Sequence, residues 1–240
     1  MRVLITNDDS ISSPVLVPLA IWAKKLGDVT VAVPKFEQSG KSHGIELHKA
    51  FEVRRVDFPE GIEAYTVDST PADCVRYAVL GLHREFDLVI SGINKGYNLG
   101  IDALYSGTVA AIYEAAALGI PAIALSSDPK NLEPALAQLD AVYDFFVRHD
   151  LMKKWSHYNV NLPLEPKGMR FTRQGGPMYS DDFPDIGDHM VMPTGKYVYK
   201  DSNNMNLDTD ATMHGYVSIC PVTLERTNLD VFRELTKLNP

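Results

Sequence analysis

Apolar residues follow two different periods along the first two thirds of the chain. Short runs rich in Val, Ile and Leu predict buried strands, and the clearest lie at residues 2–6, 29–34, 87–91 and 121–126. Apolar residues at helical spacing predict helices at residues 15–26, 72–82, 108–118 and 132–147, and extended segments are expected at residues 45–56 and 62–67. Strands that alternate with helices indicate an α/β fold of the Rossmann-like, doubly wound class, with a mostly parallel sheet covered on both faces.

The pattern changes near residue 155. Extended runs interrupted by Pro, Gly and Asp predict β-hairpins, at residues 158–163, 169–173, 196–200 and 216–222. Surface loops are expected at residues 177–188 and 201–210, and a final helix at residues 229–238. We therefore expect a core in residues 1–155 and a C-terminal β-hairpin-rich extension with a helix in residues 156–240. The boundary is a change of architecture and not a linker.

Two adjacent carboxylates, Asp8 and Asp9, directly follow the first predicted strand. They should therefore lie at the carboxyl end of the sheet, where open parallel sheets bind ligands. Neighbouring carboxylates repel each other unless a cation or a shared proton offsets the repulsion, and a divalent metal is the simplest partner. The alternative is that residues 7–10 form only a polar turn and a helix cap.

Other polar residues follow neighbouring strands and should meet the acidic pair. The second strand leads to Ser39, and the strand at residues 87–91 leads to Asn94 and Asn98. Carboxylate, hydroxyl and amide oxygens are ligands for Mg²⁺, Mn²⁺ or Ca²⁺, and no His/Cys spacing resembles a zinc site. Each Ser or Asn alone is better explained as a satisfied loop residue. Their convergence with the acidic pair favours a metal site.

A glycine-rich segment at residues 91–108 is the second chemical signal. Its glycines let backbone N–H groups approach an anion, and Ser106-Gly107-Thr108 opens a helix whose N-terminus favours phosphate. The segment fits neither Gly-x-Gly-x-x-Gly nor the P-loop pattern. Beside a metal site, it would complete a centre for phosphate chemistry.

Composition narrows the possible partners. The chain has 31 acidic and 23 basic residues and a formal net charge of −8, which argues against a nucleic-acid duplex or an anionic membrane surface as partner. No run approaches the roughly 18 apolar residues that span a bilayer. Cys74 and Cys220 are the two cysteines and lie far apart in the sequence. Free thiols in a reducing cytoplasm are favoured over a disulfide.

Several motifs together resemble the SurE family of survival-protein nucleotidases. They are spread over most of the chain, as residues 6–9 (TNDD), 37–40 (EQSG), 70–75 (TPADCV), 91–94 (SGIN), 105–109 (YSGTV), 160–163 (VNLP) and 215–219 (GYVSI). The resemblance implies a metal-dependent phosphomonoesterase, a 5'-nucleotidase acting on nucleoside monophosphates, with the choice between 5' and 3' phosphate open. It also implies a homodimer or homotetramer, in which the C-terminal hairpin and helix exchange between subunits.

The resemblance also assigns site residues. Asp8, Asp9, Ser39 and Asn94 match the family's metal ligands, with one divalent cation per subunit, Mg²⁺ or Mn²⁺. The phosphate-binding positions match Asn98, Ser106, Gly107 and Thr108. The expected reaction is attack of a metal-activated water on phosphorus, with Asp8 or Asp9 as the catalytic proton acceptor.

Three departures from the family pattern stand out. Ser10 and Ser69 replace glycines, and the tyrosine-tryptophan element near residues 197–199 is altered. If residue 10 needs a positive φ, serine is strained there by about 1 kcal/mol. The altered element concerns base contacts more than the chemistry.

Rival functions make different demands on the same residues. A covalent aspartyl phosphatase of the haloacid-dehalogenase type has its two aspartates separated by one residue, whereas here they are adjacent. A receiver domain is about half as long and needs Asp at the end of its central strand, where this chain has Ser91. A nucleotide-binding module without activity is the third rival. His43, His214 and Lys95 could assist catalysis, although partnered or solvated roles are favoured for the histidines.

Overall fold

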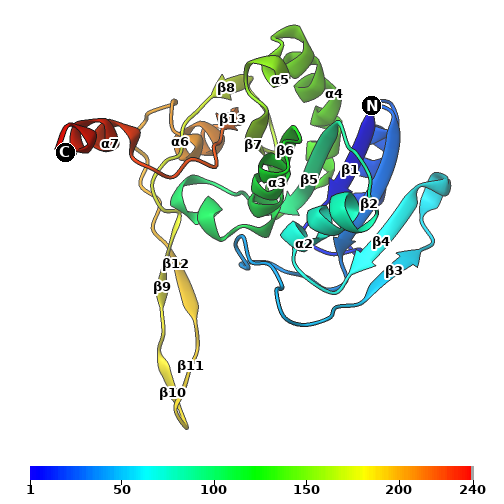
Figure 1. Cartoon of the computed structure of the whole chain (residues 1–240). Helices are drawn as coiled ribbons and strands as arrows, with labels where there is room; N and C mark the ends of the chain where they lie inside the picture. Colours follow the sequence, from blue (N-terminus) through cyan, green and yellow to red (C-terminus); the bar gives the residue numbers. More distant parts are fainter. Residues whose placement is uncertain (239–240) are drawn as a thin grey trace.

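A nine-stranded, mostly parallel sheet forms the centre of the computed structural model, which describes residues 1–238 (Figure 1). In spatial order the strands are β3 (Val53–Val56), β4 (Glu63–Val67), β2 (Asp28–Pro34), β1 (Arg2–Thr6), β5 (Leu88–Lys95), β6 (Ala122–Ser127), β7 (His157–Leu162), β13 (Val217–Pro221) and β8 (Met169–Phe171). The strands from β4 to β7 are parallel, whereas β3 and β13 pair antiparallel with β4 and β7. The predicted α/β, Rossmann-like class is confirmed.

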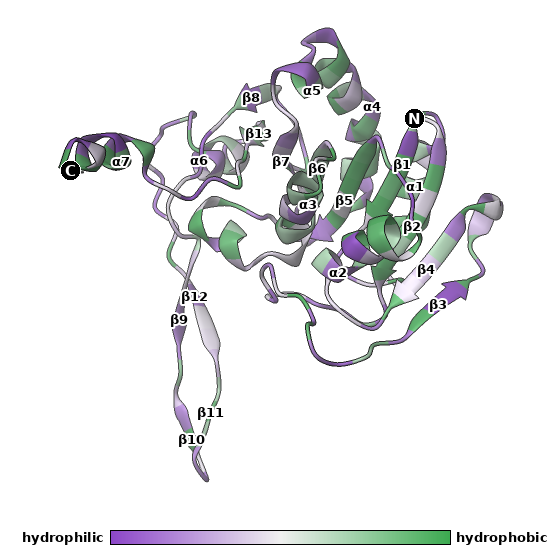
Figure 2. Ribbon diagram, in the orientation of Figure 1, coloured by the Kyte–Doolittle hydropathy of each residue, from purple (hydrophilic) through white to green (hydrophobic). Residues whose placement is uncertain are grey.

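Helices cover both faces of the sheet. One face packs against α1 (Leu16–Ala23) and α4 (Glu133–Arg148), and the other against α2 (Pro71–Arg76) and α3 (Gly107–Ala117). The alternation within β1 explains this arrangement, because Val3 and Ile5 join the first apolar cluster and Leu4 joins the second. Figure 2 shows the resulting apolar central strands. No helix within residues 1–238 has the length and apolar character needed to cross a membrane.

The elements of residues 1–155 follow the sequence expectations closely, with four main differences. Strand β5 continues to Lys95, so Asn94 lies within it. The helix expected at residues 72–82 divides into α2 and a π-helical turn at Tyr77–Gly81. Residues 45–52 form no strand, and the short helix α5 (Leu151–Lys154) was not predicted.

After residue 155 the chain both extends the sheet and leaves it. Strands β7, β13 and β8 belong to the central sheet, and the antiparallel partner of β7 is the distant β13 instead of a strand next to it in sequence. The expected surface loop at residues 177–188 was wrong, because it contains β9 (Tyr179–Asp182) and β10 (Asp185–Gly187). Strand β9 pairs with β12 (Thr194–Tyr197), and β10 pairs with β11 (Met190–Val191). Together the four strands form a long projecting hairpin (Figure 1). Helix α6 (Asp208–Met213) follows, and α7 (Leu229–Leu235) confirms the final helix.

Cys74 and Cys220 are buried free thiols. Loss of hydration disfavours the thiolate, so burial raises the pKa of Cys220 to about 12 and raises the pKa of Cys74 well above its usual range. Both side chains therefore stay neutral at physiological pH and act as small apolar residues of the core.

Apolar burial between sheet and helices predicts a clear contrast between two isoleucines. Ile112 on α3 is fully buried, whereas Ile21 on α1 is 42% exposed. We expect Ile112→Ala to lower the free energy of unfolding by about 2–5 kcal/mol. Ile21→Ala should lower it by much less, because little cavity is created. Equal losses in urea denaturation would contradict this packing.

Candidate active site at the carboxyl edge of the sheet

Asp8 joins the end of β1 to the start of α3. Its Oδ1 accepts a hydrogen bond of 2.6 Å from the Thr108 hydroxyl, and its Oδ2 accepts one of 3.2 Å from the Thr108 N–H. Asp8 is 3% exposed, and burial raises the pKa of its carboxylate even though both Thr108 bonds oppose the shift. A Cβ on Gly107 would lie 3.0 Å from the Asp8 Cβ, so a glycine at this position lets the start of α3 pack closely against Asp8.

Asp9 lies half-buried beside Asp8. Its Oδ2 accepts a 3.1 Å bond from the main-chain N–H of Lys95 at the end of β5. Burial, followed by repulsion from Asp8 and Glu37, raises the pKa of Asp9 to about 6. Neither member of the acidic pair forms an ion pair within residues 1–238. The pair therefore lacks the positive charge that two neighbouring carboxylates favour.

Ser39 and Asn94 keep oxygen atoms free for such a charge. The Ser39 hydroxyl donates to Glu37 Oε1 at 2.8 Å, which leaves the lone pairs of its oxygen available. Asn94 donates from Nδ2 to the Gly96 carbonyl at 2.8 Å, and its Oδ1 accepts no hydrogen bond in the described part of the chain. Two carboxylates, a hydroxyl and an amide oxygen form a donor set that fits a hard divalent cation.

The N-terminus of α3 leaves one amide free for an anion. Ser106 caps the helix, because its Oγ accepts from the Val109 N–H at 3.1 Å. The Thr108 N–H is bonded to Asp8, as described above. Among the described residues, the Gly107 N–H has no hydrogen-bond partner, so it is the amide of this first turn that can bind an anion.

Asn98 fixes the glycine-rich segment to the neighbouring strands. Its Nδ2 donates to Ser126 at the end of β6, and its main-chain N–H donates to Asn161 Oδ1 on β7 at 2.9 Å. Its carbonyl accepts bonds from the amides of Asn159 and Asn161. These buried contacts orient the backbone of the segment.

A cavity of about 410 Å³ opens at this edge of the sheet. Five of the residues expected at the site line it, namely Asp8, Ser39, Asn94, Asn98 and Ser106. Asp9, Gly107 and Thr108 do not line the cavity themselves, but each contacts a residue that does, Lys95 or Asp8. The volume falls in the range of small-molecule sites.

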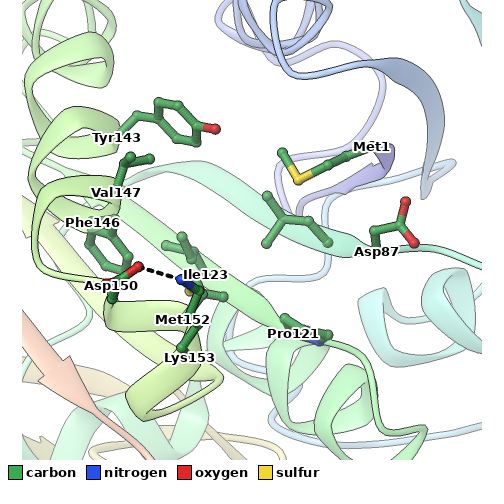
Figure 3. Close-up of a pocket in the computed structure, with 11 residues that line it drawn as sticks. Met1, Asp87, Pro121, Ile123, Tyr143, Phe146, Val147, Asp150, Met152 and Lys153 are labelled. Atoms are coloured by element: carbon green, nitrogen blue, oxygen red, sulfur yellow. Dashed lines mark hydrogen bonds and ion pairs between the residues drawn. The ribbon is translucent and has the colours of Figure 1, made fainter.

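A second cavity, of about 270 Å³, opens at the opposite ends of the strands (Figure 3). Met1, Asp87 and Pro121 precede three parallel strands and line it together with Phe146 of α4. Its one ion pair in view joins Lys153 to Asp150 at 2.8 Å. None of the residues expected to carry chemistry lines this cavity.

Both histidines considered for catalysis have carboxylate partners. His43 Nε2 lies 2.9 Å from Glu114 Oε2 on α3, and His214 Nε2 lies 2.8 Å from Asp201 Oδ2. Neither histidine lines the cavity beside Asp8, whereas Lys95 does. In the structure both histidines therefore have hydrogen-bond partners outside the cavity, as the sequence analysis favoured.

Comparison with known proteins identifies the family. The family model for "Survival protein SurE" matches residues 3–181. The chain belongs to the SurE family. Proteins named 5'-nucleotidase SurE from Thermosipho africanus and 5'-nucleotidase SurE 1 from Thermus thermophilus are 36% and 39% identical to it, over 98% and 95% of this chain and 96% and 93% of theirs. The crystal structure of the SurE protein from Aquifex aeolicus covers all of both chains, with a TM-score of 0.78 and 32% identity.

Membership of the SurE family makes the serine at position 10 informative. Ser10 has φ 71°, the left-handed conformation that glycine adopts without strain. Its hydroxyl lies 2.9 Å from the Ser12 hydroxyl, which offsets part of that strain. Both aspartates still reach their partners on α3 and β5. Ser69, the second departure, donates to Asp73.

Several residues of the site carried no clear signal in the sequence. The negative charge of Glu37 repels those of Asp8 and Asp9 and so contributes to their raised pKa values. The one hint of a role for Glu37 in the sequence was its place in the motif at residues 37–40. Asn159 and Asn161 are two residues apart on β7, so both lie on the same face of that strand and make it polar. Tyr179 lines the cavity from the projecting hairpin, and nothing in its local sequence indicates this position.

The backbone conformation at residue 10 gives a testable order of stability. We expect Ser10→Gly to be more stable than Ser10→Ala by about 1–2 kcal/mol, because both lose the hydroxyl and only glycine relieves the positive φ. Chemical denaturation of the two variants measures this difference. Equal stability would show that residue 10 is not strained.

The raised pKa of Asp9 predicts a pH dependence for the cation-free protein. The folded state binds this proton more tightly than the unfolded chain, whose Asp pKa is about 3.9. The stability contributed by protonated Asp9 is therefore lost as pH rises from about 4 to about 6. With EDTA present, Asp9→Asn should gain stability relative to wild type across that window. A pH-independent difference in urea unfolding would contradict the shift.

Proposed function

We propose that this chain is a metal-dependent phosphomonoesterase that hydrolyses nucleoside 5'-monophosphates to nucleoside and phosphate, with 3'-monophosphates as the other class to test. The observation that carries the proposal is the uncompensated Asp8–Asp9 pair beside the free Gly107 N–H. A cation and a phosphate need these two features side by side. Relatives named 5'-nucleotidase support the choice of substrate.

The residues divide into a cation side and a phosphate side. Asp8, Asp9, Ser39 and Asn94 would bind one divalent cation per subunit, Mg²⁺ or Mn²⁺, through their oxygens. The chemistry that such a cation supplies is activation of a water nucleophile and neutralisation of phosphate charge. The Gly107 N–H and the positive end of α3 would bind a phosphate oxygen. Asn98, Ser106 and Thr108 orient these groups through the contacts described above.

Asp9 is the better candidate to accept the proton of the attacking water. Thr108 donates to both oxygens of Asp8, whereas Asp9 receives one bond, on Oδ2. Asp9 is also the more exposed of the two carboxylates. Its second oxygen can therefore take a proton without breaking a contact between β1 and α3.

We propose that the C-terminal extension, described up to residue 238, assembles subunits and completes the substrate pocket. Exposed apolar side chains gather on the projecting hairpin and on α7, among them Phe183, Ile186, Met190, Val231 and Phe232. Apolar surface of this kind is typical of a protein interface. We propose a homodimer or homotetramer formed through these elements. The two free thiols support a cytoplasmic location.

Phosphate release from nucleoside 5'- and 3'-monophosphates tests the proposed activity. With Mn²⁺ or Mg²⁺, we expect turnover that EDTA abolishes and that returns when the cation is restored. Asp8→Asn and Asp9→Asn should each lower kcat by about 100-fold or more while the circular dichroism spectrum is kept. Asp28→Asn, an exposed carboxylate at the start of β2, is the matched control.

Three outcomes would overturn parts of this assignment. Turnover that survives removal of the cation would exclude the metal-dependent reaction. Near-normal turnover of Asp8→Asn or Asp9→Asn at saturating cation would remove that residue from the site. Phosphate trapped covalently on the chain would favour an aspartyl nucleophile.

A further inference from the structure

Two tyrosines form an exposed aromatic surface on the cavity that contains Asp8. Tyr105 and Tyr179 line this cavity, and each is 57% exposed. Tyr105 directly precedes Ser106, the cap of α3, so it lies next to the proposed phosphate position. Tyr179 comes from the first strand of the projecting hairpin. Large aromatic side chains that are exposed beside a polar site are surfaces available to a ligand.

The backbone of each tyrosine is fixed by a hydrogen bond from another element. Asp102 Oδ2 accepts the main-chain N–H groups of Met178 at 2.9 Å and of Tyr179 at 3.0 Å. The Tyr105 carbonyl accepts the N–H of Ser42 at 3.0 Å. The two rings are thus presented to the cavity from fixed backbone positions, which lowers the entropy lost when a ligand binds.

A ladder of aromatic rings supports Tyr179 from the side of the hairpin. Its ring meets Tyr197 edge-to-face, with centroids 5.6 Å apart, and Tyr197 lies 6.1 Å from Tyr199. The Tyr199 hydroxyl donates to the buried Asp210 at 3.1 Å. The orientation of Tyr179 therefore depends on contacts that continue into α6.

We propose that Tyr179 and Tyr105 bind the base of the nucleotide substrate by stacking, and that Asp102 is the residue that positions Tyr179. This inference rests on the proposed phosphomonoesterase function. Every base has a flat π-face, so stacking accepts purines and pyrimidines alike. The surface therefore favours phosphomonoesters that carry an aromatic base over sugar phosphates that carry none.

The test compares kcat/KM for adenosine 5'-monophosphate with that for ribose 5-phosphate, which lacks the base. We expect Tyr179→Ala to lower the ratio of the two values about 10-fold, mainly through KM for the nucleotide. Tyr179→Phe should keep the ratio, because the ring remains. Asp102→Asn should lower it by less, since a neutral acceptor binds the two N–H groups more weakly.

Phe183→Ala is the matched control, because Phe183 is an exposed aromatic residue on the same hairpin that does not line the cavity. It should leave the ratio unchanged. An unchanged ratio in Tyr179→Ala, or an equal fall in Phe183→Ala, would overturn the stacking role and favour a role of the hairpin in assembly. If the wild type released phosphate from neither substrate, the proposed function itself would fail, so the two failures can be told apart.

Discussion

The contact between Asp8 and Thr108 is the interaction on which the site depends. It joins the carboxyl end of the central strand β1 to the first turn of α3, across 100 residues of sequence, and uses both oxygens of a buried carboxylate. Because the Thr108 amide is used in this way, the Gly107 amide is the one left for an anion. One hydrogen-bonded pair thus sets the distance between the cation side and the phosphate side of the site.

The rest of the edge is fixed to this contact by buried polar groups. Asn98 ties the glycine-rich segment to β6 and β7. Asp208 accepts the N–H groups of Gly100 and Gly175, which joins the same segment to α6. Gly100 is required there, since a Cβ would lie 1.8 Å from the Gly176 carbonyl oxygen. The cavity is therefore shaped by residues from both halves of the chain.

Much of this arrangement could be predicted from the sequence, because it follows from local rules. Alternation of strands and helices indicates a parallel sheet, and a parallel sheet brings Asp8, Ser39 and Asn94 to one edge. The pairing of β7 with β13 could not be predicted. A short apolar run has the same sequence pattern whether its partner strand is near or distant along the chain. The projecting hairpin also lacks an apolar period, because both of its faces are exposed. Asp102 and Tyr179 meet only through this long-range fold.

Anomalous diffraction from crystals containing Mn²⁺ and inorganic phosphate tests the central claim most directly. We expect one manganese peak per subunit at about 2.1 Å from oxygens of Asp8 and Asp9, with a phosphate oxygen within hydrogen-bond distance of the Gly107 N–H. Manganese bound elsewhere, with the acidic pair contacting only protein atoms, would contradict the account.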